Sequence, residues 1–235
     1  MVTWAYILLV VGVAAWALLM PSGKKFADGT VHAITVFGGA FLLGVCFLEL
    51  VPELAEAFSA IGEHMGYAPF IAVLVGFLVQ QMLDGLSAHA EHGHAEDDFT
   101  VGGLMIGLCL HAFLEGMPIV WDGHVNTALL WGIVVHNIPV AILLVGIMSA
   151  RNYGFWRVLA MLSIFGIMSP AGSLCSRYIL QPDAAWRSII TGLVVGVLLH
   201  VSSSILFDHK RNHFSWLNIG LTILAFGVAA AVSIF

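Results

Sequence analysis

Charged side chains are scarce in this sequence, and their scarcity excludes an ordinary soluble protein. Only 9% of the 235 residues are charged, whereas 60% are hydrophobic, and the mean hydropathy is +0.99. Soluble domains contain about 25% charged residues on average. Lipid is therefore expected to be the main solvent of the chain. The charges are spread over short connections, which gives no sign of a nucleic-acid surface.

Several other patterns are missing as well. Segments of alternating polar and apolar residues are absent, which excludes a transmembrane β-barrel. The three cysteines, Cys46, Cys109 and Cys175, fall inside apolar runs without paired spacing, so neither a disulfide framework nor a thiolate metal cluster is expected. No nucleotide-binding motif is present, which disfavours an ATP-driven pump.

Long apolar runs dominate what remains. A bilayer offers no water to backbone groups, so apolar runs of about 20 residues must form helices. The runs lie at 2–20, 31–57, 68–88, 100–120, 127–149, 156–180, 186–207 and 215–234. They predict an all-α integral membrane protein of about eight transmembrane helices, in a single domain over 1–235. The first run lacks a basic leader and a cleavage site, so we expect a retained helix.

Basic residues in the connections predict the orientation. An N-terminus outside the cell would place six of the eight on the cytoplasmic side, namely Lys24, Lys25, Arg151, Arg157, Lys210 and Arg211. We therefore expect a multi-pass protein of the plasma membrane, the inner membrane of a bacterium. The same orientation puts a low-complexity loop at 87–99 in the cytoplasm. There His89, His92 and His94 alternate with acidic residues, which fits either weak metal contacts or a solvated loop.

Ionisable side chains inside the apolar runs are the functional candidates, because a charge at the bilayer centre costs roughly 2.5–3.5 kcal/mol. His111 and Glu115 stand four residues apart and project from one helical face, close enough to share a cation. The next run contains His136-Asn137-Ile138-Pro139. The connection between the two runs is short, so we expect antiparallel neighbours in which His111 and His136 meet near mid-depth.

Imidazole and carboxylate ligands suit zinc, iron(II), manganese or cobalt. The alternative for His111 and Glu115 is a buried hydrogen bond that pins two helices together. For His200, beside a run of serines, ligation and a helix-packing hydrogen bond both stay open. His32 lies near the end of its run, where a structural role is expected.

Three segments carry a family resemblance by their order and spacing. They read FLLGVCFLELVPEL at 41–54, LCLHAFLEGMPI at 108–119 and VVHNIPVAI at 134–142. These segments are similar to the second-, fourth- and fifth-helix motifs of the ZIP (Zrt/Irt-like) family of divalent metal transporters. The number of helices, the outside N-terminus and the His-rich cytoplasmic loop fit the same family.

The resemblance implies an inverted 3+2+3 bundle, frequently a homodimer, that moves a divalent metal toward the cytoplasm. Zinc is the expected substrate, with iron, manganese and cadmium as alternatives, and no prosthetic group is implied. By motif position, His111 and Glu115 are metal ligands, and His136 with Asn137 completes the site from the fifth helix. Glu49 takes the place of a second-helix histidine.

Departures from the family pattern predict a single metal site. Residues that are not the usual ligands stand at four positions, Ala112, Asn137, Val140 and Ser169. Glu115 is then the one firm carboxylate, so the site should hold a dication less tightly.

An intramembrane zinc-dependent hydrolase is the main alternative function. In it His111, His136 and His200 would hold zinc, and Glu115 would assist an activated water. The sequence has no His-Glu-x-x-His motif. We therefore expect a carrier rather than an enzyme.

Overall fold

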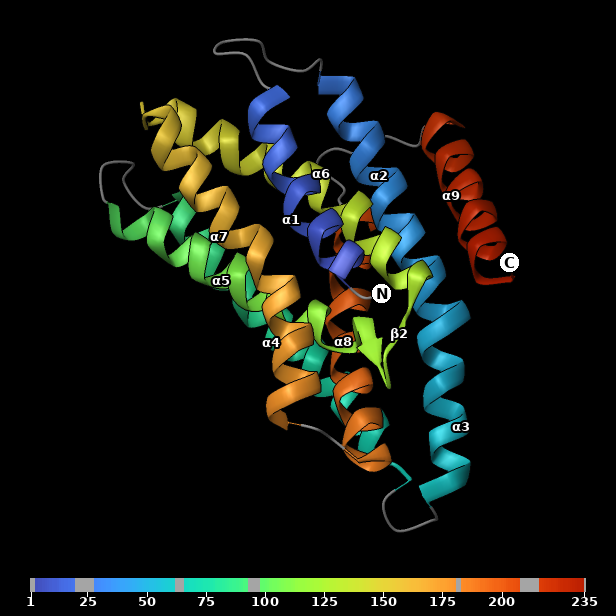
Figure 1. Cartoon of the computed structure of the whole chain (residues 1–235). Coiled ribbons are helices and arrows are strands. Elements are labelled where there is room, and N and C mark those ends of the chain that lie inside the picture. Colours follow the sequence, from blue (N-terminus) through green and yellow to red (C-terminus); the bar gives the residue numbers. More distant parts are fainter. Residues whose placement is uncertain are drawn as a thin grey trace.

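The computed structural model describes residues 3–19, 28–61, 66–92, 98–180, 183–207 and 216–234. In this part of the chain the α-helices are α1 (Thr3–Leu19), α2 (Asp28–Val45), α3 (Val51–Ile61), α4 (Ala68–His92), α5 (Asp98–Gly116), α6 (Thr127–Ala150), α7 (Phe155–Leu174), α8 (Ala184–Phe207) and α9 (Trp216–Ile234) (Figure 1). Shorter elements are the π-helical turns η1 (Cys46–Leu50) and η3 (Cys175–Leu180), the 3-10 turn η2 (Met117–Ile119), and the strands β1 (Val120–Trp121) and β2 (His124–Val125).

The predicted all-α membrane architecture is confirmed. Among the described residues, seven helical segments are long and apolar enough to cross a bilayer. They are Gly29–Glu56, Ala68–Gly85, Gly102–Ile119, Thr127–Ser149, Phe155–Leu180, Ala184–Phe207 and Trp216–Ile234. Helix α1, with 17 residues, precedes them. These segments follow the apolar runs closely, because in lipid only a helix satisfies every backbone group of such a run.

A proline shapes the second helical rod, in which α2, η1 and α3 follow one another directly. Pro52 has no N–H to donate and its ring crowds the preceding turn, which disturbs regular α-helical bonding there. The wider π-turn lies immediately before it, and the N–H of Val51 bonds to the carbonyl of Cys46. The rod therefore continues across the proline instead of ending at it.

Glycines let the helices of two pairs approach closely. At Gly192 and Gly196 on α8, an added Cβ would overlap the backbone carbonyls of Pro69 and Val73 on α4. Gly172 on α7 bears the same relation to the Phe113 carbonyl on α5. Small residues four apart are a common device for packing helices within membranes. The pairs α4–α8 and α5–α7 are therefore fixed by backbone contact.

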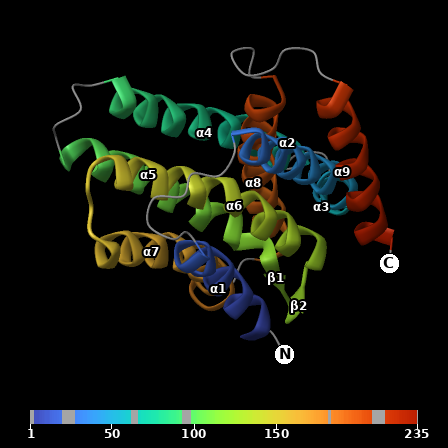
Figure 2. The ribbon, with the colours of Figure 1, turned by 90° about the horizontal axis from the view of Figure 1, so that it is seen from above.

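Helix α6 lies in the middle of the bundle when it is seen from above (Figure 2). It packs against α1 and α2, whereas α5 packs against α7 and α4. Helix α9 lies at the edge, against α2. In the described part of the chain, α5 and α6 are not a closely packed backbone pair, so side chains make the contact between them.

A small β-hairpin joins α5 to α6. Strands β1 and β2 pair antiparallel across Asp122 and Gly123, whose φ angles are 49° and 81°. Asp-Gly is favoured in two-residue hairpins because both positions need a positive φ. The next residue after β2, Asn126, caps α6 by accepting a hydrogen bond from the Leu129 N–H at 2.9 Å. The hairpin thus sets where α6 begins.

Candidate metal site

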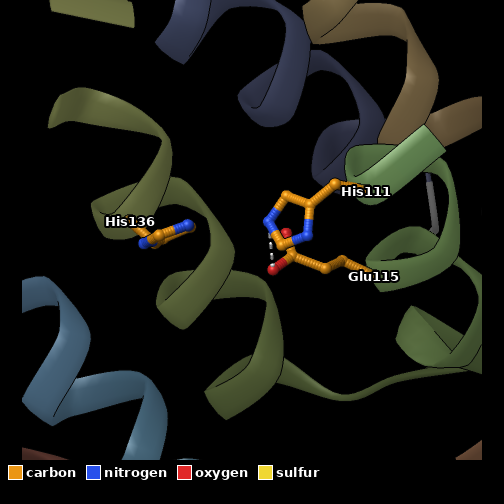
Figure 3. Close-up of side chains that lie close together, drawn as sticks. All are labelled: His111, Glu115 and His136. Carbon is orange, nitrogen blue, oxygen red and sulfur yellow. Dashed lines mark ion pairs between the residues drawn. The ribbon is translucent and has the colours of Figure 1, made fainter. Parts of the chain in front are cut away.

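Two side chains of α5 begin the site. His111 and Glu115 lie one helical turn apart and are buried, with exposed fractions of 4% and 0%. Nε2 of His111 lies 3.0 Å from Oε1 of Glu115. Figure 3 shows both side chains leaving the same helix on the same face. The arrangement follows from their four-residue spacing.

A third side chain comes from α6. His136 is buried, with 3% exposed, and its ring meets the His111 ring edge to face at a centroid distance of 5.9 Å. One potential ligand atom from each of His111, Glu115 and His136 lies within 4.8 Å of the others. Of the described residues, these three form the single group of His, Cys, Asp or Glu side chains with such a geometry. The expected meeting of the two histidines is therefore present in the structure.

Buried polar atoms in this group lack partners. Within the described residues, neither carboxylate oxygen of Glu115 nor Nδ1 of His136 has a hydrogen-bond partner. The 3.0 Å approach of His111 Nε2 to Glu115 Oε1 is close, but its alignment falls short of a hydrogen bond. Burying a carboxylate without hydrogen bonds is unfavourable. A cation between the three side chains would satisfy these atoms.

The donor set fits a divalent transition metal. Two imidazoles and one carboxylate supply three ligands, which leaves a position open in a tetrahedral shell. Nitrogen and oxygen donors suit zinc, iron(II), manganese and cobalt. The structural alternative, a buried His–Glu hydrogen bond that pins two helices, is not formed in the described part of the chain, because neither oxygen of Glu115 has a hydrogen-bond partner there.

One residue at the site was not anticipated. Gln80 of α4 is buried, and its Oε1 lies 2.9 Å from Nδ1 of His111. Its Nε2 donates to Oδ1 of Asp84 at 2.7 Å. A search for ionisable residues in apolar runs overlooks an uncharged carboxamide. The sequence does indicate Gln80 in another way, because it is a polar residue in the middle of an apolar run.

Two further residues, Asn137 and Glu49, are predicted as ligands but are not part of the group of three. Asn137 follows His136 on α6 and is buried, and its Oδ1 has no hydrogen-bond partner in the described part of the chain. Its ligation stays a prediction. Glu49 lies in the π-turn η1 and is partly exposed, and the structure does not bring it into the group of three.

The other intramembrane histidines lie apart from this group. Nδ1 of His200 on α8 lies 3.3 Å from Oδ2 of Asp84, and its ring packs edge to face against Phe77. Nε2 of His32 on α2 lies 3.3 Å from Oδ1 of Asn218 on α9. Both residues therefore make contacts between helices; His32 does so by a hydrogen bond, whereas Nδ1 of His200 has no hydrogen-bond partner in the described part of the chain.

The expected loop at 87–99 is shorter than predicted. Helix α4 continues to His92 and α5 begins at Asp98, because no glycine or proline interrupts the chain from Ser87 to His92. The side chains of His89 and His92, and the whole of His94, lie outside the described residues. Metal contacts there stay a prediction.

The fold and the site together define a polytopic α-helical membrane protein with a buried His–Glu–His group. In comparisons with known proteins, no protein-family model matches this chain, and no curated protein matches it either. The resemblance to the ZIP family consequently stays a prediction from the three motifs.

Proposed function

We propose that this protein carries a divalent transition metal, zinc in the first place, across its membrane through the site of His111, Glu115 and His136. One observation supports the proposal most: three metal-ligating side chains from two helices converge in the buried interior of a membrane-spanning bundle. Ionisable groups are energetically costly in this environment. Those that occur there commonly mark a substrate pathway.

The charge of the group suits transient binding. A dication beside one carboxylate and two neutral imidazoles keeps a net charge of +1, so the electrostatic attraction is weaker than in a site with two carboxylates. Three protein ligands also leave a coordination position for the water or ligand that accompanies a metal as it enters and leaves. A carrier needs such a site because its substrate must be released.

Prolines in the helical segments next to the site support the same function. Pro139 lies within α6 three residues after His136, and Pro118 lies in η2 three residues after Glu115. Helix α5 gives way to the 3-10 turn η2 at Met117, whereas α6 continues through Pro139. Secondary carriers commonly place their substrate sites beside interrupted helices inside the bundle. Transport toward the cytoplasm, with the N-terminus outside, follows from the ZIP resemblance and the distribution of basic residues.

The position of His200 argues against the hydrolase alternative. That mechanism needs His200 as the third histidine on the metal, but His200 pairs with Asp84 and is not part of the group of three. The proposed carrier uses only residues that lie together.

Transport can be tested with purified protein in liposomes that contain a zinc-sensitive dye. The parent should show saturable zinc entry, and His111→Ala should abolish it because the site loses one of its two imidazoles. His32→Ala is the matched control: it also removes an intramembrane histidine, but His32 contacts Asn218 and lies outside the site. Its zinc entry should equal that of the parent.

The outcomes separate the alternatives. Saturable entry that disappears only in His111→Ala supports a carrier that uses this site. Entry that is equal in the parent and in His111→Ala contradicts the assignment of the site. An absence of entry in the parent contradicts the transport function itself.

A further inference from the structure

Gln80 is a buried polar residue in an apolar environment, where an unpaired amide would be energetically costly. It lies in α4, an apolar membrane helix, and its exposed fraction is 4%. Both ends of its carboxamide are used: Oε1 faces Nδ1 of His111, and Nε2 donates to Asp84. A buried amide with both ends paired has a defined orientation.

The orientation of the amide decides what it does to His111. The structure places the Nε2 end of Gln80 against Asp84, with 2.7 Å between Nε2 and Oδ1, and an ionised carboxylate accepts hydrogen bonds only. The Oε1 end must then face His111 at 2.9 Å, and an amide oxygen can only accept. Nδ1 of His111 therefore carries a hydrogen and donates it to Gln80. When the imidazole is neutral, the lone pair lies on Nε2, which faces Glu115.

Asp84 also approaches a histidine of another helix, although its side chain is half exposed. Nδ1 of His200, on α8, lies 3.3 Å from Asp84 Oδ2. The two helices that carry Asp84 and His200 are the closely packed α4–α8 pair, in which Gly192 and Gly196 leave no room for a Cβ. The His200–Asp84 contact therefore joins two closely packed helices, and Asp84 in turn accepts the hydrogen bond from Gln80.

We propose that Gln80 is a positioning residue of the metal site: its carboxamide fixes the ring nitrogen of His111 that is offered to the metal. Metal binding by His111 rests on the proposed function, whereas the choice of ring nitrogen does not. Without the acceptor on Gln80, the ring hydrogen moves to Nε2, where the Glu115 carboxylate, with Oε1 3.0 Å away, attracts it electrostatically. His111 then presents an N–H instead of a lone pair to the site.

Ligating histidines generally donate their second ring nitrogen to a carboxylate, a carbonyl or water, and loss of this partner weakens metal binding about 10–100-fold. Here a carboxamide has this role, and Asp84 fixes its orientation. Gln80 and Asp84 act as a unit. The residue at position 80 must accept the hydrogen bond from His111, and the residue at position 84 must form the hydrogen bond that orients the side chain at position 80.

The test combines two measurements on the full chain in detergent. Zinc affinity is measured by calorimetric titration, and the hydrogen on each ring nitrogen of His111 is read from nitrogen-15 spectra of metal-free, histidine-labelled protein. The His111 signals are identified by their loss in His111→Asn. Gln80→Met removes the acceptor while keeping the length of the side chain. Gln81→Met is the matched control, because Gln81 is the next residue of α4 and is exposed.

A double variant provides the rescue. Gln80→Glu with Asp84→Asn exchanges amide and carboxylate, so that the carboxylate now at position 80 still accepts from His111 and the new amide at position 84 donates to it. We expect Gln80→Met to lose the hydrogen at Nδ1 and to bind zinc about 10–100-fold more weakly. The control and the double variant should keep both the Nδ1 hydrogen and the affinity of the parent.

Two results would overturn the inference: a hydrogen at Nδ1 that persists in Gln80→Met, or a double variant that behaves like Gln80→Met. Failure of the proposed function looks different. If the parent binds no zinc, the metal assignment fails, and the spectra of the metal-free proteins still decide whether Gln80 selects the nitrogen.

Discussion

Glu115→Gln is the substitution that probes the metal site most selectively. Glu115 is the only carboxylate in the group of three and is fully buried. Glutamine has nearly the same shape, so the packing around it is kept while the negative charge is lost. A lost metal ligand should then appear as a lost response to zinc, not as a general loss of stability.

The size of the effect can be worked out. With free zinc at about 100 times the Kd of the parent, binding adds about 2.7 kcal/mol to the free energy of unfolding. Loss of a residue that only hydrogen-bonds a ligand weakens binding by about 10–100-fold, so loss of the ligand itself should reach at least about 100-fold. The same zinc concentration then equals the Kd of the variant, and the stabilisation falls to about 0.4 kcal/mol.

The assay is thermal unfolding in detergent with and without zinc. Glu49→Gln is the control, because Glu49 is the predicted carboxylate that the structure leaves out of the group. It should keep the full zinc-dependent rise in the unfolding temperature. If Glu115→Gln keeps this rise, or if Glu49→Gln loses it, the carboxylate has been assigned to the wrong residue.

Three further predictions concern packing, the hairpin and pH. Gly196→Ala should lower the free energy of unfolding by about 1–3 kcal/mol, because the added Cβ would overlap the backbone of α4. Gly146→Ala is the control, since its Cβ would meet open space. Equal unfolding temperatures of the two variants would contradict this packing. The hydrogen bonds from Arg187 lower the pKa of the exposed Asp122 carboxyl, so the pair stabilises the fold above the usual carboxyl pKa and is lost as pH falls through the lowered value. Arg187→Gln should raise this pKa in a carbon-13 titration, and an unchanged value would refute the coupling. Zinc affinity should fall as the pH is lowered, since protons compete with the metal for histidine and carboxylate ligands, and a Kd that does not change with pH would exclude such ligands.

The helices could be predicted because lipid leaves a long apolar run no alternative to a helix. Helix α6 was expected over 127–149 and is found at Thr127–Ala150. The sequence becomes polar at Ser87, which predicts a loop from there, but α4 ends later, at His92. Polarity reports the edge of the membrane, but a helix continues until a residue such as glycine or proline ends it.

The site could be predicted in part. Spacing alone put His111 and Glu115 on one face, and a short connection brought His136 near them. Gln80 could not be placed by such rules, because its contact with His111 joins residues 31 positions apart through the packing of α4 against α5. The position of Glu49 could not be predicted by such rules either, because it depends on the π-turn η1 between α2 and α3.

The most direct test of the account is to identify the metal ligands in lipid-reconstituted protein by zinc-edge X-ray absorption together with zinc content per chain, for the parent and His136→Ala. We predict a shell of imidazole nitrogen and carboxylate oxygen in the parent, and one zinc fewer per chain in the variant. Equal zinc content and an unchanged spectrum would contradict the metal site.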